Sequence, residues 1–91
     1  MKEAYIEHLK SASNETIMIS VADKIHNVTN LISLHKKIGK SMWKNFEFTA
    51  EDNIWYHESV LKVAQDKLPS GLWEQYRKVI QEAKIAYTHD I

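Results

Sequence analysis

Residues that interrupt or cross-link regular structure are scarce in this sequence: 91 residues include no cysteine, one proline and two glycines. Without cysteine the chain can form no disulfide and no thiolate metal site, and it has no thiol nucleophile. A reducing, cytoplasmic setting is therefore expected. Because no Val-, Ile- or Thr-rich stretch alternates with polar residues over the length of a strand, the sequence predicts an all-α fold.

An excess of charge of either sign is also lacking, since 12 Lys and Arg residues balance 12 Asp and Glu residues. This balance argues against a nucleic-acid or membrane-surface partner recognised through charge. No apolar run approaches the roughly 18 residues that a membrane span needs, and the opening MKEAYIEHLK lacks the apolar centre of a signal peptide. We expect no nucleic-acid partner and no membrane partner, so recognition should depend on a defined site.

The length fits one domain, residues 1–91, which buries only roughly 60–65% of its unfolded surface. We predict a small bundle of four to five helices. Ser13 is suited to be the N-cap of a long helix that runs to about Ile38, and Gly39 is suited to end it. The predicted helices cover residues 2–11, 14–38, 41–45 and 50–67, and a last one follows the break at Pro69-Ser70-Gly71.

Two capping and packing patterns support these helices. Thr49-Ala50-Glu51-Asp52 resembles a capping box, weakened because Asp replaces Glu at its last position. The last helix has the clearest amphipathic stripe, formed by Leu72, Tyr76, Val79, Ile80, Ala83 and Ala86. Both patterns favour a helical bundle with a thin core.

The long second helix has two different faces. Its core-facing stripe falls within an arc of about 80° and consists of Met18, Val21, Ile25, Val28 and Ile32. The opposite side carries a short carboxylate, an imidazole and two amides: Asp23, His26, Asn27 and Asn30. Solvated helix faces more often carry Lys and Glu in i,i+4 pairs.

We expect this polar side to be partly enclosed, because Ile19 and Leu34 extend it with apolar groups. A carboxylate removed from water must be paired, hydrogen-bonded or bound to a metal. The residues alone leave two interpretations open. In the first, Asp23 pairs with a nearby lysine or a backbone donor, and the asparagines cap neighbouring loops. In the second, Asp23 binds a metal ion and the amides hold a substrate.

One segment carries a family resemblance. Val21-Ala22-Asp23-Lys24-Ile25-His26-Asn27 resembles the last motif of the HD superfamily of metal-dependent phosphohydrolases, in particular the (p)ppGpp hydrolase domains of the RelA/SpoT type. The flanking segments Lys2-Glu3-Ala4-Tyr5 and Ile54-Trp55-Tyr56 are similar to those of such hydrolases, so the resemblance covers most of the chain. It implies an all-α fold that corresponds to the C-terminal half of an HD-type domain.

The resemblance also implies roles for individual residues. In such enzymes a divalent metal, with Mn²⁺ the expected ion, is held by a His, an adjacent His-Asp pair and a later Asp, and Asp23 occupies the position of that later Asp. Asn27 matches the asparagine that lines the nucleotide pocket. Lys24 matches the basic position after the Asp, either as a substrate contact or as a surface salt-bridge partner, and Asn30 stands at a variable position with a possible substrate-binding role. The implied substrate is a nucleotide or a (p)ppGpp-like molecule.

The sequence departs from the family pattern because the first His and the His-Asp pair would precede Lys2, and this chain begins at Met1. A hard divalent ion wants four to six ligands, so one carboxylate leaves most positions to water. We therefore expect the chain to be inactive alone. His89-Asp90 spells the missing dipeptide, but at the C-terminus; His8 approaches Asp23 only if the first two helices fold back on each other.

Three functional classes follow. The chain is the C-terminal portion of an HD-type guanosine polyphosphate or related nucleotide pyrophosphohydrolase; or it is a non-catalytic helical binding or oligomerisation module that retains the scaffold; or it is a small enzyme completed by residues of another chain.

The aromatic residues are dense for so short a chain. They would leave apolar surface uncovered if half a domain is missing, so a homodimer is the expected state.

Overall fold

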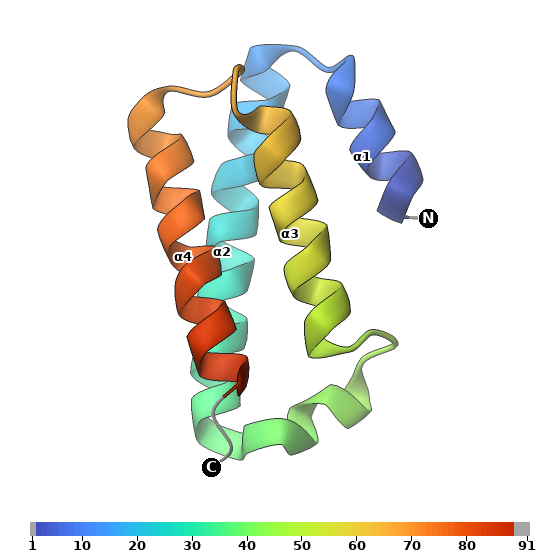
Figure 1. Ribbon diagram of the computed structural model, residues 1–91, viewed down its shortest axis with the longest axis vertical. Helices are drawn as coiled ribbons and strands as arrows, with labels where there is room; N and C mark the ends of the chain where they lie inside the picture. The colour runs from blue at the N-terminus through green and yellow to red at the C-terminus, as the bar shows by residue number, and fades with distance from the viewer. Residues whose placement is uncertain (1, 89–91) are drawn as a thin grey trace.

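The computed structural model describes residues 2–88 of the chain, with side chains from residue 3 onward. In this part of the chain, all regular structure is helical, which confirms the all-α prediction. The elements are α1 (Lys2–Lys10), α2 (Asn14–Ile38), the 3₁₀ helix η1 (Gly39–Asn45), α3 (Ala50–Ala64) and α4 (Ser70–Thr88) (Figure 1). No helix within residues 2–88 combines the length and the apolarity that crossing a membrane requires.

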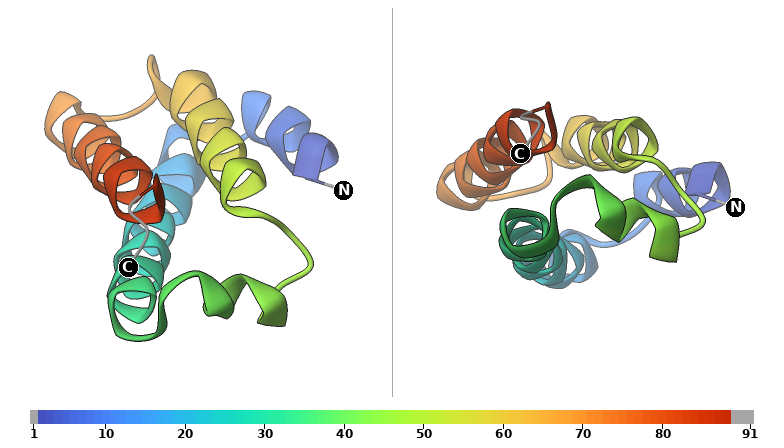
Figure 2. Two further views of the ribbon diagram at one scale, coloured as in Figure 1. Left: turned by 60° about the horizontal axis from the view of Figure 1, so that its bottom comes forward. Right: turned by 90° about the horizontal axis from the view of Figure 1, so that it is seen from below.

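Three long helices form the body of the molecule. The α2 and α4 helices run in the same direction, α3 runs against both, and α1 lies outside α3 (Figure 1). An end-on view shows α2, α3 and α4 at the corners of a triangle, with α1 to one side and η1 crossing the end of the bundle (Figure 2). The most extensive helix contact joins α2 to α4, and α1 packs mainly on α3.

The predicted caps begin and end these helices. The Ser13 hydroxyl accepts a hydrogen bond from the Thr16 backbone N–H at 3.1 Å, as an N-cap should. Gly39 follows α2 with a φ of 67°, in the half of conformational space that side chains with a Cβ rarely enter. The capping box is complete, since the side chains of Thr49 and Asp52 each accept a hydrogen bond from the other residue's backbone N–H.

Two predicted boundaries were wrong. The α3 helix ends at Ala64, because residues 65–67 form turns. The Lys67 ammonium in this turn donates to the backbone oxygens of Leu9 and Lys10, which places it against the end of α1. Ser70 and Gly71, predicted as part of the break, lie inside the first turn of α4.

All five helical elements contribute to the core, and α2 and α4, whose predicted stripes meet, contribute most of it. Val21 and Val28 of α2 are fully buried, as is Tyr76 of α4. Met18 departs from the prediction, because 38% of its surface remains exposed at the open edge of the stripe. A second cluster closes the lower end of the bundle, where the Trp43 ring lies 4.9 Å from the Tyr87 ring in an edge-to-face contact.

Candidate functional site

The four polar residues of the α2 motif lie on the solvent-exposed face of the helix. Asp23, His26, Asn27 and Asn30 are all exposed. The expectation of a partly enclosed side was therefore wrong for this part of the chain. The physical reason is that α2 turns its apolar stripe toward α4 and η1, and none of the described elements packs over the opposite face. Ile19, on the same face, is 67% exposed.

Asp23 and Asn27 lie side by side one helical turn apart. The Asn27 Nδ2 group approaches the Asp23 Oδ2 atom at 3.4 Å, a long hydrogen bond that leaves the carboxylate accessible. Asn30 lies further along the exposed face. The structure thus presents a carboxylate and an amide together on an open surface. Among the described residues Asp23 pairs with Asn27 and not with a lysine or a backbone donor, so that interpretation was wrong, and metal binding by Asp23 stays a prediction.

Lys24, next to Asp23, points the other way into the molecule. Only 8% of its surface is exposed, so its interpretation as a surface salt-bridge partner was wrong. Its ammonium donates to the Tyr5 hydroxyl at 2.9 Å and to the Ser20 hydroxyl at 3.0 Å, and the two hydroxyl oxygens are 2.5 Å apart. A buried ammonium requires such partners because it has lost its water. The substrate-binding role of Lys24 stays a prediction.

Two tyrosine rings lie close to this ammonium group. The Lys24 Nζ atom lies 4.4 Å from the centre of the Tyr5 ring and 5.7 Å from that of Tyr56, within the range of cation–π attraction. The two rings are 6.2 Å apart. We call Tyr5, Ser20, Lys24 and Tyr56 the lysine cluster; it joins α1, α2 and α3.

The lysine cluster changes the acidity of its phenols in opposite directions. Burial alone would raise the pKa of Tyr5, but the hydrogen bonds from Lys24 and Ser20 stabilise the phenolate, and the net effect lowers that pKa. For Tyr56 burial is the stronger influence and raises the pKa despite the nearby ammonium. The negative charge of Asp23 works against the Tyr5 phenolate, which places that carboxylate within electrostatic reach of the cluster.

The other candidate ligands do not gather around Asp23. His57 is buried, and its Nδ1 atom is 2.7 Å from the Tyr76 hydroxyl in the core. His8 is exposed on α1. His89 and Asp90 lie outside the described residues. Within residues 3–88, no group of three or more His, Asp or Glu side chains is close enough to hold a metal ion, so Asp23 fits a hard cation as a single ligand only.

The sequence did not predict the lysine cluster. Its one local signal is the i,i+4 spacing of Ser20 and Lys24, which places both on the same side of α2. Tyr5 and Tyr56 are 51 positions apart, and only the packing of α1 on α3 brings their rings together.

No protein-family model matches the sequence, and no curated protein matches it either. The resemblance to HD-type phosphohydrolases therefore stays a prediction from the residues 21–27 and their flanks.

Proposed function

We propose that this chain provides the Asp23-bearing helical half of an HD-type metal-dependent phosphohydrolase that acts on a guanosine polyphosphate or a related nucleotide. The observation that carries the proposal is the placement of Asp23 beside Asn27 on an open helix face, while the neighbouring Lys24 is buried. An exposed carboxylate and amide can meet ligands carried by another segment or another polypeptide. The remaining metal ligands, one His and a His-Asp pair, would have to come from there.

Each residue has a distinct part in this proposal. The Asp23 carboxylate would provide one oxygen ligand for Mn²⁺, and the Asn27 amide would hydrogen-bond to the nucleotide. A bound divalent ion of this kind lowers the pKa of a coordinated water and so supplies a nucleophile for phosphorus. Lys24 acts through the lysine cluster as a positioning residue, because its ammonium is occupied by Tyr5 and Ser20.

The exposed apolar residues favour a second candidate function, a non-catalytic assembly module. Ile19, Leu34 and Ile38 of α2 are 67%, 36% and 46% exposed. Ile19 and Leu34 flank the polar residues, so a partner covering this face would bury both kinds of side chain together. A homodimer through this face is the form that this candidate takes.

Mn²⁺ titration followed by NMR tests the first proposal. We expect paramagnetic broadening centred on the amides around Asp23 and Asn27, and we expect Asp23→Asn to remove it. Asp66→Asn is the matched control, because Asp66 is an exposed carboxylate in the turn after α3. Broadening spread equally over the surface carboxylates would contradict the proposal.

Complementation then separates the two candidates. We expect the chain mixed with a polypeptide that carries a His and a His-Asp pair to release pyrophosphate from (p)ppGpp with Mn²⁺, and the Asp23→Asn mixture to be inactive. A stable homodimer that neither binds Mn²⁺ near Asp23 nor complements would support the assembly module instead. Analytical ultracentrifugation with Ile19→Glu measures the oligomeric state directly.

A further inference from the structure

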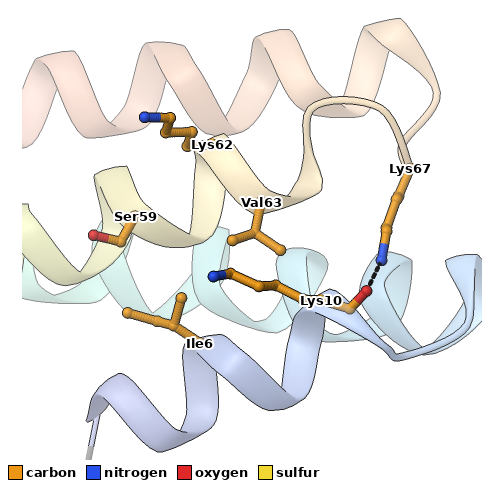
Figure 3. Close-up of a pocket in the computed structure, with 6 residues that line it drawn as sticks. All are labelled: Ile6, Lys10, Ser59, Lys62, Val63 and Lys67. Atoms are coloured by element: carbon orange, nitrogen blue, oxygen red, sulfur yellow. Dashed lines mark hydrogen bonds between the residues drawn. The ribbon is translucent and has the colours of Figure 1, made fainter.

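An open cavity of about 430 Å³ lies between α1 and α3, on the side of the molecule away from the α2–α4 contact. It is lined by Ile6, Lys10, Ser59, Lys62, Val63 and Lys67. In Figure 3 the Lys10 side chain reaches from α1 between Ile6 and Val63, toward Ser59. The cavity therefore combines an apolar wall with charged groups.

Its charge is unusual for this protein. The chain as a whole carries no net charge, yet three lysines from two helices and the following turn line one cavity, and no acid is among the lining residues. The only carboxylate that an ion pair places beside these lysines, among the described residues, is Glu7, whose Oε1 atom is 2.8 Å from the Lys10 Nζ atom. Two positive charges are left uncompensated.

The three ammonium groups differ in availability. Lys67 donates to the backbone oxygens of Leu9 and Lys10, which are neutral and leave its full charge in place. The Lys62 ammonium forms no hydrogen bond or ion pair with the described residues. Both members of the Lys10–Glu7 pair are more than half exposed, so this ion pair is held weakly and an anion of higher charge can replace it.

We propose that this cavity binds a small phosphate monoester as its dianion. The phosphate would lie between the Lys10 and Lys62 side chains, whose ammonium groups point apart in Figure 3 and would turn toward it, with the positive charge of Lys67 further along the cavity. The organic part would cover Ile6 and Val63. A phosphate monoester carries a charge near −2 at pH 7, which balances the charges of Lys62 and of Lys10 once Glu7 is displaced, and lysine ammonium groups bind phosphate as point charges. The site is independent of Asp23 and of the proposed hydrolase function.

Phenyl phosphate is the probe that tests this site, because it joins a dianion to an apolar ring. We expect saturable chemical-shift changes confined to α1, the C-terminal part of α3 and the turn to α4. The double variant Lys10→Gln/Lys62→Gln should weaken binding about tenfold or more, as the loss of two charge-assisted contacts requires. Lys36→Gln, which removes an exposed lysine of α2, should leave the affinity unchanged.

A variant that is expected to strengthen binding makes the test specific. Glu7→Gln removes the carboxylate that competes for Lys10, so it should strengthen phenyl phosphate binding, whereas an unspecific surface effect would not depend on Glu7. Inorganic phosphate should bind at the same place more weakly, because it leaves Ile6 and Val63 uncovered. Benzyl alcohol, which has the ring but no charge, should not bind.

Three results would overturn the proposal: no saturable binding of phenyl phosphate, equal loss of binding in Lys36→Gln, or no gain in Glu7→Gln. Circular dichroism of each variant checks that the helices remain folded. Since all substituted side chains are exposed, folding should be retained.

Discussion

At the scale of single residues, neighbours in the α2 motif have opposite environments. Asp23 is open to water, while Lys24 is buried with an ammonium that bonds to two hydroxyls. A change at Asp23 should affect ligand binding and leave the fold intact, whereas a change at Lys24 should alter the packing of three helices. Substitutions at the two positions therefore separate function from stability.

Removing the buried ammonium should be visible in the acidity of Tyr5. In Lys24→Met the pKa of the Tyr5 phenol should rise, because burial remains and the hydrogen bond and charge that stabilise the phenolate are lost. Titration of the Tyr5 ring carbon by NMR measures the shift. Lys36→Met, an exposed lysine of the same helix, should leave the Tyr5 titration unchanged.

At the scale of elements, the start of α3 depends on two reciprocal hydrogen bonds. Thr49→Ala removes the side-chain acceptor for the Asp52 backbone N–H, and the free energy of unfolding should fall by about 1 kcal/mol. Urea denaturation measures the difference. Thr29→Ala is the matched control, since the exposed Thr29 hydroxyl donates only to a carbonyl within α2; if it cost as much, the cap would not be the cause.

The outer helix α1 depends on the turn after α3 for its C-terminal end. Lys67→Met removes the donor to the Leu9 and Lys10 oxygens, so the opening free energy of α1 should fall by about 1–2 kcal/mol. Hydrogen exchange should show faster exchange in α1 and little change in α2 and α4. Lys44→Met, an exposed lysine of η1, provides the comparison, and uniform acceleration throughout the chain would contradict a local role.

At the scale of the whole molecule, buried phenols should limit stability in alkali. Burial raises the pKa of Tyr87 to about 12 and raises that of Tyr76 further, while the unfolded chain ionises its tyrosines near 10. A group with a raised folded pKa stabilises fully below the unfolded pKa, and this contribution is lost as the pH rises through the folded value. Tyr5, with a lowered pKa, acts in the opposite direction but is a single group.

We therefore expect the melting temperature to fall between about pH 10 and 12, with a smaller fall in Tyr87→Phe. The Tyr87 hydroxyl is buried without a hydrogen-bond partner among the described residues, so Phe replaces it at little cost near neutral pH. Thermal unfolding followed by circular dichroism across this range measures both effects. An equal alkaline loss in both proteins would show that Tyr87 does not contribute.

The sequence predicted those features that depend on neighbours along the chain. Ser13, Gly39 and the Thr49 box act within a few residues, so their caps were predicted correctly. The exposure of Asp23 and the burial of Lys24 were not predicted, because both depend on which elements cover each face of α2. The C-terminal end of α3 was predicted wrongly for the same reason. Lys67 contacts residues 57 and 58 positions away, and no local pattern predicts that contact.

That distant contact also bears on how the chain acquires its structure. The α1 helix leaves the ribosome before α2, α3 and α4, yet the side chain that holds its end comes from the turn between α3 and α4. Loop closure over such a span is slow compared with local helix formation. Of these helices, α1 should thus be among the last to dock, and the nascent chain would expose Ile6 and Leu9 until the turn after α3 has left the ribosome.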